Sequence, residues 1–231
     1  DANVHINWLR HIEELKAQHP SHIVRKSDEL LPQFVLKRLT EVTQGRGIVV
    51  TGVGQHQMWA AQHCTFKEPN TLLTSGGLGT LGFEVPAALG AQVGRPDTVV
   101  WSVCGDGGFQ MTMCDIATAV ESGADVKFAI LNNTNLGMVH QLQDVFFAQD
   151  YMASEFSANP DFVKIAEAYG IRGIRVTKQE EVVDAVQQAM ETAGPVIVDF
   201  MVKQDEIVFP FIPSGQSVKE MLEEPAHNET S

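Results

Sequence analysis

The stretch from Val99 to Met138 decides the fold and reads VVWSVCGDGGFQMTMCDIATAVESGADVKFAILNNTNLGM. Two apolar runs, at 99–104 and 126–131, are short and rich in β-branched residues, which is typical of buried strands. Residues 111–121 between them predict a helix. A strand, a helix and a second strand in this order predict two neighbouring parallel strands of an α/β sheet.

Polar side chains follow both predicted strands. Asp106 stands within Gly105–Gly108, and Asn133 comes directly after the second strand. Ligands of open α/β sheets bind at the carboxyl ends of the strands, so we expect this carboxylate and this amide on one rim. Their oxygens suit Mg²⁺, and the glycines allow a diphosphate to approach the backbone. Each motif alone is more often an ordinary turn, but both at this spacing favour a metal-bridged diphosphate.

The rest of the chain alternates predicted helices and strands. Helices are expected over 3–19, 31–42, 56–62, 83–93, 159–169 and 179–192, and strands over 48–51, 72–74, 174–176 and 196–202. This order predicts an α/β fold with a parallel sheet of about six strands and helices on both faces. Asn159 is expected to cap one helix, and Thr177 with Glu180 another. We expect 136–151 to be a mobile loop that covers the site.

Composition limits the class of protein. The chain has 231 residues, of which 44% are hydrophobic and 19% charged, which fits a folded domain. The net charge of −13 argues against nucleic acid and anionic membranes as partners. No apolar run is long enough to predict a membrane span. The three cysteines, Cys64, Cys104 and Cys114, form no C-x-x-C pair, so a reducing, cytoplasm-like compartment is expected.

The motifs together resemble a known family. Gly-Asp-Gly followed by Asn-Asn at this distance is similar to the cofactor motif of thiamine-diphosphate enzymes. Four further segments resemble the catalytic subunit of acetohydroxyacid synthase, also called acetolactate synthase: Gly52–Ala61 (GVGQHQMWAA), Ser75–Gly82 (SGGLGTLG), Leu136–Val139 (LGMV) and Ile212–Gly215 (IPSG). The resemblance extends from about Leu30 to Gly215 and matches the C-terminal third of such a subunit.

The resemblance implies a thiamine-diphosphate-binding fold and a set of site residues. Asp106, Asn133 and the backbone carbonyl of Asn135 would hold Mg²⁺, which anchors the cofactor through its phosphates. The implied cofactor-binding residues are Val53, Gly54, Gln55, His56, Gly79, Leu81, Gly105, Asp106, Gly107, Gly108, Asn133, Leu136, Gly137 and Met138. Leu142 and Ser214 would belong to the substrate channel.

The implied activity is the condensation of two 2-keto acids with decarboxylation, in branched-chain amino-acid biosynthesis. The resemblance implies no catalytic residue in this chain, because the glutamate that activates the cofactor belongs to an N-terminal domain. That domain would be supplied across a homodimer interface, and a small regulatory subunit is a possible further partner. FAD would bind mostly outside this chain. We therefore expect weak cofactor binding and no activity from the chain alone. The expected location is the cytoplasm, or the stroma or matrix of an organelle.

The resemblance also divides the chain into parts. Residues 1–28 would be a helix and linker from a preceding middle domain, and 29–203 the domain that binds thiamine diphosphate and Mg²⁺. Residues 204–231 would be a tail that partly closes the active site, with 226–231 disordered. Because the chain starts at Asp1 without methionine, we expect a part of a longer protein.

Three positions depart from the family pattern. The family usually carries methionine at Leu81, glycine at Glu84 and tryptophan at Leu142. Leu81 keeps an apolar contact of similar volume, whereas Leu142 changes the shape of the expected substrate channel. Glu84 is not the activating glutamate of the family.

Three alternative functions have to be weighed against this interpretation. Another thiamine-diphosphate 2-keto acid decarboxylase or carboligase would share the metal motif, and a decarboxylase would release an aldehyde. A non-catalytic diphosphate-binding domain is a second possibility. A dinucleotide-binding module would need a third glycine soon after Gly52 and Gly54, and this chain lacks it.

Overall fold

The computed structural model describes residues 5–19 and 24–224. The chain divides into two compact units, one of Asp1–Lys26 with Val208–Ser231 and one of Ser27–Ile207. The predicted disorder of 226–231 and the middle of the predicted linker, 20–23, lie outside the described residues. In the described ranges, no helix has the length and apolar character that crossing a bilayer requires.

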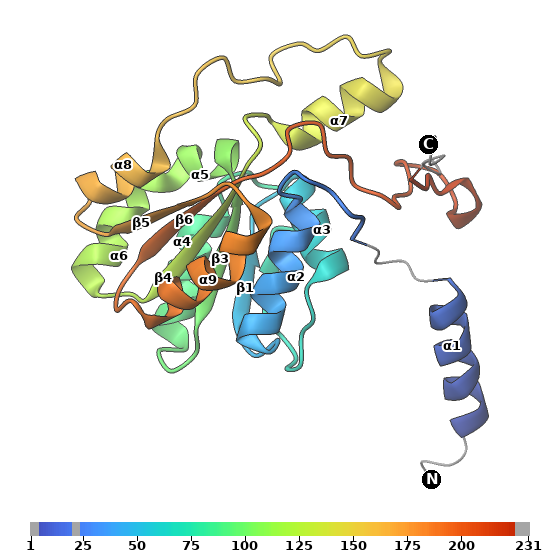
Figure 1. The fold of residues 1–231 in the computed structure, drawn as a ribbon, viewed down its shortest axis with the longest axis horizontal. Coiled ribbons are helices and arrows are strands. Elements are labelled where there is room, and N and C mark those ends of the chain that lie inside the picture. The colour runs from blue at the N-terminus through green and yellow to red at the C-terminus, as the bar shows by residue number, and fades with distance from the viewer. Residues whose placement is uncertain (1–4, 20–23, 225–231) are drawn as a thin grey trace. The chain divides into compact units, whose positions relative to one another are not determined.

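The larger unit is built on one parallel sheet of six strands, in the order β2-β1-β3-β4-β6-β5 (Figure 1). The strands are β1 (Ile48–Thr51), β2 (Leu72–Thr74), β3 (Val100–Gly105), β4 (Val126–Asn132), β5 (Arg172–Val176) and β6 (Val196–Met201). Each neighbouring pair is parallel. The predicted α/β class and the six-stranded parallel sheet are therefore confirmed.

Helices cover both faces of this sheet (Figure 1). One face carries α2 (Pro32–Thr43), α3 (Gln55–His63) and α9 (Val182–Glu191), and the other carries α4 (Glu84–Gly94), α5 (Asp106–Thr112), α6 (Ile116–Ser122) and α8 (Phe162–Ala168). A strand covered on both faces has no solvent side, which explains why every residue of β4 is buried.

Aromatic packing fixes the start of α5 at the end of the sheet. Phe109 is fully buried and lies edge-on to Phe128 of β4 and Phe162 of α8, with ring centroids 5.9 and 5.5 Å apart. Because Phe109 follows the glycine pair directly, this core contact holds the Gly-Asp-Gly-Gly turn in place. The helix predicted over 111–121 therefore begins earlier, at Asp106, and is interrupted by a 3₁₀ turn at Met113–Asp115.

The segment predicted as a loop over 136–151 is mostly helical, so that prediction was wrong. Helix α7 occupies Gly137–Phe146 and lies beyond the carboxyl ends of the strands (Figure 1). Its buried residues are His140 and Gln141, whereas Val139, Leu142 and Phe146 keep large exposed fractions. The helical period of its apolar residues was present in the sequence, but the glycine at its start obscured it.

Two predicted helix caps are displaced along the chain. Asp161 caps α8, because its carboxylate accepts hydrogen bonds from the backbone N–H groups of Val163 and Lys164. Asn159 therefore does not cap α8, and its side chain donates a hydrogen bond to Asp106 instead. Before α9, Glu181 and not Glu180 accepts the backbone N–H groups that precede the helix.

The smaller unit contains little regular structure. Helix α1 (Ile6–Gln18) matches the helix predicted over 3–19, and a short 3₁₀ turn covers Val218–Glu220. An isolated antiparallel bridge pairs Phe211 with Leu222. The tail has no long helix in its described part, as its prolines predicted.

Candidate functional site

A pocket opens where the sheet changes its direction of winding. From β1 the chain crosses to β2 at one edge, whereas from β3 it crosses to β4 on the other side, although β1 and β3 are neighbours. Ligands of doubly wound sheets bind in the crevice at such a point. The pocket encloses about 640 Å³ of space, part of it open to solvent.

The turns after β1, β3 and β4 together form the wall of this pocket. The lining residues are Val53, Gly54, Gln55, His56, Trp59, Leu81, Gly105, Gly107, Gly108, Leu131, Asn133, Asn135, Leu136, Gly137, Met138 and Val139. Every predicted cofactor-binding residue except Gly79 and Asp106 is among them. The structure therefore brings together residues from Val53 to Val139, which lie 86 positions apart in the sequence.

Some predicted site residues lie outside this wall. Gly79 is exposed and has a left-handed backbone, with φ +67°. Leu142 does not line the pocket, and Ser214 belongs to the other compact unit. Their predicted roles are neither supported nor contradicted by these positions.

The sequence reasoning missed Trp59, which lines the pocket and is nearly fully buried. It lies on α3, three residues after His56. Residues at this spacing share one face of a helix, and this is the signal that could have found it.

Asp106 lies between two glycines that line the pocket, Gly105 and Gly107, and is fully buried. The register pairs Gly105 of β3 with Leu131 of β4, which places Asp106 beside the asparagines that end β4. Its Oδ1 accepts the N–H of Gly107 at 3.0 Å, and its Oδ2 accepts the side-chain amide of Asn159 at 2.7 Å. Burial raises the pKa of Asp106 to about 6, although these hydrogen bonds act in the opposite direction.

Hydrogen bonds with α3 and with the segment after β6 hold Asn133 and Asn135 in place. Asn133 donates to Oε1 of Gln55 at 3.3 Å, and its own oxygen accepts the backbone N–H of Asn135, also at 3.3 Å. The side chain of Asn135 exchanges hydrogen bonds with Gln204. The role predicted for Asn135 uses its backbone carbonyl, and this side-chain arrangement is compatible with that role.

His56 and Gln55 begin α3 but differ in their partners. The amide nitrogen of Gln55 donates to Gln141 at 2.8 Å and to the backbone carbonyl of Glu206 at 2.7 Å. Nε2 of His56 is buried and has no hydrogen-bond partner among the described residues. Burial lowers the pKa of His56 to about 4, so its ring is neutral at neutral pH. An unpartnered polar atom in a pocket wall points to a bound polar ligand.

The donor set fits a magnesium–diphosphate ligand. Magnesium is usually held by one or two carboxylates together with phosphate oxygens and water. The described residues contain no cluster of three histidine, cysteine, aspartate or glutamate side chains that could hold a metal alone. Asp106 supplies one carboxylate and Asn133 one amide oxygen, so a phosphate ligand would have to supply the remaining charge. The residues present therefore fit this group.

Glu84 is a second buried carboxylate near the site. It begins α4, is fully buried, and has no hydrogen-bond partner of normal geometry for either oxygen among the described residues. Its carboxylate fills the space behind two glycines, because a Cβ on Gly52 or Gly108 would collide with it. Burial raises the pKa of Glu84 to about 7, although nearby backbone N–H groups of Glu84 and Gly82 partly oppose this.

Comparison with known proteins assigns the fold and the pocket to a class. Residues 52–200 match the family described as "Thiamine pyrophosphate enzyme, C-terminal TPP binding domain". This match covers more than half of the chain, and thiamine pyrophosphate is another name for thiamine diphosphate. The chain belongs to this family.

Within that class the chain is similar to acetolactate synthases. It is 42% identical over 221 residues to the "Acetolactate synthase" of Mycobacterium leprae, covering 93% of this chain and 35% of that protein. It is 42% identical over 220 residues to the mitochondrial catalytic subunit of Saccharomyces cerevisiae, covering 93% and 32%. It is 45% identical over 216 residues to the large subunit of Corynebacterium glutamicum, covering 91% and 34%. The chain thus spans about a third of the length of these relatives.

Proposed function

We propose that the pocket binds thiamine diphosphate with Mg²⁺, and that this chain is the C-terminal cofactor-binding part of an acetolactate synthase. The observation that carries the proposal is the unpartnered Nε2 of His56, in a glycine-lined pocket that also contains Asn133 and adjoins Asp106. Similarity to acetolactate synthases over more than nine-tenths of the chain favours this enzyme among those that use the cofactor.

The residues that line or adjoin the pocket have different proposed roles in binding the cofactor. Asp106, Asn133 and the backbone carbonyl of Asn135 hold the metal, and His56 donates from its neutral ring to a phosphate oxygen. The apolar side chains of Leu81 and Met138 contact the rings of the cofactor and exclude water. When bound, thiamine diphosphate supplies the carbanion-stabilising chemistry that decarboxylation of a 2-keto acid requires.

The remaining parts of the enzyme are proposed to come from elsewhere. This chain has no assigned activating glutamate, so an N-terminal domain would supply it across a homodimer interface. FAD would be bound mainly by a middle domain, and residues 1–28 would lead from that domain into this chain. Residues 29–203 would bind thiamine diphosphate and Mg²⁺, and residues 204–231 would partly close the active site. We propose a cytoplasmic or organellar location, and three relatives carry "mitochondrial" or "chloroplastic" in their names.

Calorimetry tests the binding part of the proposal. Thiamine diphosphate is titrated into the purified chain, with Mg²⁺ and then with EDTA, alone and together with the proposed partner domain. Binding that requires Mg²⁺ is the expected result. Binding that is unaffected by EDTA would overturn the metal bridge, and an absence of binding in the presence of the partner domain would overturn the cofactor assignment.

A product assay tests the activity. The chain with the partner domain is supplied with pyruvate, and acetolactate is expected. Acetaldehyde as the main product would assign a decarboxylase instead.

A further inference from the structure

A single side chain connects the proposed metal site to the rest of the sheet. The amide nitrogen of Asn159 donates to Oδ2 of Asp106 at 2.7 Å and to Oδ1 of Asn132 at 2.9 Å. Its oxygen accepts the side-chain amide of Gln110 at 3.0 Å. Both N–H groups and the oxygen of Asn159 are therefore engaged. An ionised carboxylate can only accept, so the nitrogen of Asn159 must face Asp106.

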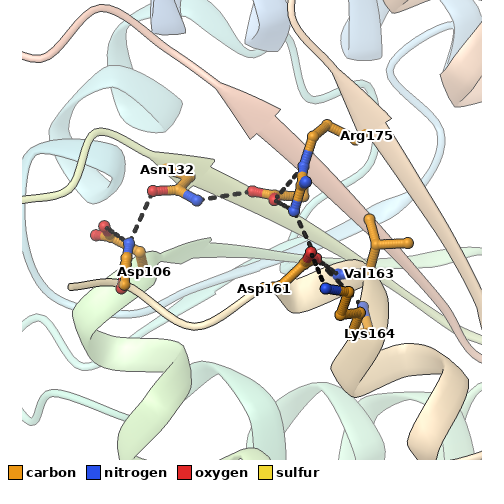
Figure 2. Close-up of polar contacts among 8 residues, drawn as sticks. Asp106, Asn132, Asp161, Val163, Lys164 and Arg175 are labelled. Carbon is orange, nitrogen blue, oxygen red and sulfur yellow. Dashed lines mark hydrogen bonds and ion pairs between the residues drawn. The ribbon is translucent and has the colours of Figure 1, made fainter.

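The contacts continue from Asn132 to the far edge of the sheet, as Figure 2 shows. Asn132 donates to Oδ1 of Asp199 at 3.0 Å, and Asp199 is fully buried. Arg175 of β5 donates to the other oxygen of Asp199 through Nε at 3.2 Å and Nη2 at 3.1 Å. Asp199 is thus satisfied by two different partners, and Asn132 is fixed between Asp199 and Asn159.

The same arginine also anchors the segment that carries Asn159. Nη2 of Arg175 contacts Oδ1 of Asp161 at 2.6 Å, and Asp161 caps α8 (Figure 2). Asn159 lies only two residues before this cap. Its position is therefore fixed from its C-terminal side by α8 and β5.

These contacts determine how Asp106 is presented to a ligand. Among the described residues, Asn159 is the one side chain that donates to the Asp106 carboxylate, and the other donors are the backbone N–H groups of Gly107, Thr134 and Asp106 itself. A carboxylate that is free to turn must be ordered when a metal binds, which lowers affinity. Hydrogen bonds to metal-binding carboxylates remove that cost, and their loss typically weakens metal binding by about 10- to 100-fold.

We propose that Asn159 is a positioning residue for the metal site: it ties the Asp106 carboxylate to the Asn132 amide and so keeps that carboxylate in the orientation that a divalent cation requires. This inference rests on the proposed function, because it assigns the cation to Asp106. It extends that function to a residue in the connection between α7 and α8, outside every motif that identified the site.

The test measures metal affinity directly. Wild type and Asn159→Ala, each with the partner domain, are titrated with Mn²⁺ at saturating thiamine diphosphate, and free Mn²⁺ is followed by electron paramagnetic resonance. The Mn²⁺ midpoint of Asn159→Ala is expected to rise by about 10- to 100-fold. At saturating metal, the affinity for thiamine diphosphate should return close to the wild-type value, because the metal restores the order of Asp106.

A matched control separates positioning from stability. Glu181→Ala removes the carboxylate that accepts the backbone N–H groups of Thr177 and Lys178 before α9, and it removes none of the hydrogen bonds of Asn159. It is expected to lower the midpoint of urea unfolding without raising the Mn²⁺ midpoint. If Glu181→Ala raises the Mn²⁺ midpoint as much as Asn159→Ala does, a general loss of stability explains the effect and the inference is wrong.

Other outcomes distinguish the inference from the proposed function. If wild type binds thiamine diphosphate with Mn²⁺ and Asn159→Ala has the same midpoint, the inference fails and the proposed function stands. If wild type does not bind, the proposed function fails and the inference fails with it.

If Asn159→Ala does not fold, Asn159→Ser replaces it in the test, because serine keeps one hydrogen-bond donor. The Mn²⁺ midpoint of Asn159→Ser is expected to lie above that of wild type. An unchanged midpoint would overturn the inference.

Discussion

Two buried carboxylates begin neighbouring helices of this protein, and their surroundings differ. Asp106 begins α5 and Glu84 begins α4, and both side chains are fully buried. Asp106 accepts hydrogen bonds from Gly107 and Asn159, whereas neither oxygen of Glu84 has such a partner among the described residues. A buried carboxylate can keep its charge only when partners replace water. Asp106 can therefore serve a cation, whereas burial raises the pKa of Glu84 to about 7, so that this carboxyl group is partly protonated at neutral pH.

The largest effect is expected from removing the partnered carboxylate. Asp106→Ala should abolish Mg²⁺-dependent binding of thiamine diphosphate, because the metal loses its only protein carboxylate. Calorimetric titration with and without Mg²⁺ measures this. Glu84→Gln is the matched comparison and should keep the metal dependence. Unchanged binding in Asp106→Ala would show that the two carboxylates do not differ in the way proposed.

The unpartnered carboxylate should affect stability and not metal binding. The pKa of Glu84 in the folded protein, about 7, lies above its ordinary value of 4.5. The protonated group therefore contributes stability that is complete below about pH 4.5 and is lost as the pH rises through about 7. Glutamine cannot ionise. The free energy of unfolding of Glu84→Gln relative to wild type should thus rise by about 3 kcal/mol between about pH 4.5 and about pH 8.5.

Urea unfolding at both pH values measures this difference. Glu68→Gln, which also removes one negative charge but from the surface, is the control for net charge. A difference between Glu84→Gln and wild type that does not change with pH would mean that Glu84 is already satisfied in the folded protein.

The smallest effect is expected at the far end of the contacts that hold Asp106. Asp161→Ala should lower the free energy of unfolding by about 1 kcal/mol, the usual cost of losing a helix cap. Urea unfolding measures this change. Lys164→Ala, which removes only the weak exposed pair with Asp161 at 3.8 Å, should change stability less. Equal effects of the two variants would mean that the cap contributes little.

The features that could be predicted from the sequence are those with a local cause. The strands were found because their apolar runs are buried on both faces, as in β4. The pocket wall was found because its glycine-rich turns follow those strands directly. Asp106 and Asn133 were placed on one rim because parallel strands joined by one helix end on the same side of a sheet.

The features that could not be predicted depend on contacts between distant segments. The contact between Asn159 and Asp106 joins residues 53 positions apart, and the sequence around Asn159 favoured a helix cap instead. The burial of Glu84 depends on Gly52 and Gly108, which belong to two other strand–helix turns. Gln55 was predicted to bind the cofactor, and only the structure shows that its amide nitrogen donates to Gln141 and to the backbone carbonyl of Glu206.

The sequence by itself thus determined the α/β class, the turns at the strand ends and the kind of ligand that their oxygens and glycines suit. Residue type and spacing are enough for these, because each depends on a few neighbouring positions. The tertiary structure decided which polar side chains are satisfied, which remain unpartnered and which hold others in place. Strand order and register set those contacts, and only the packed sheet brings together the ends of β1, β3, β4, β5 and β6.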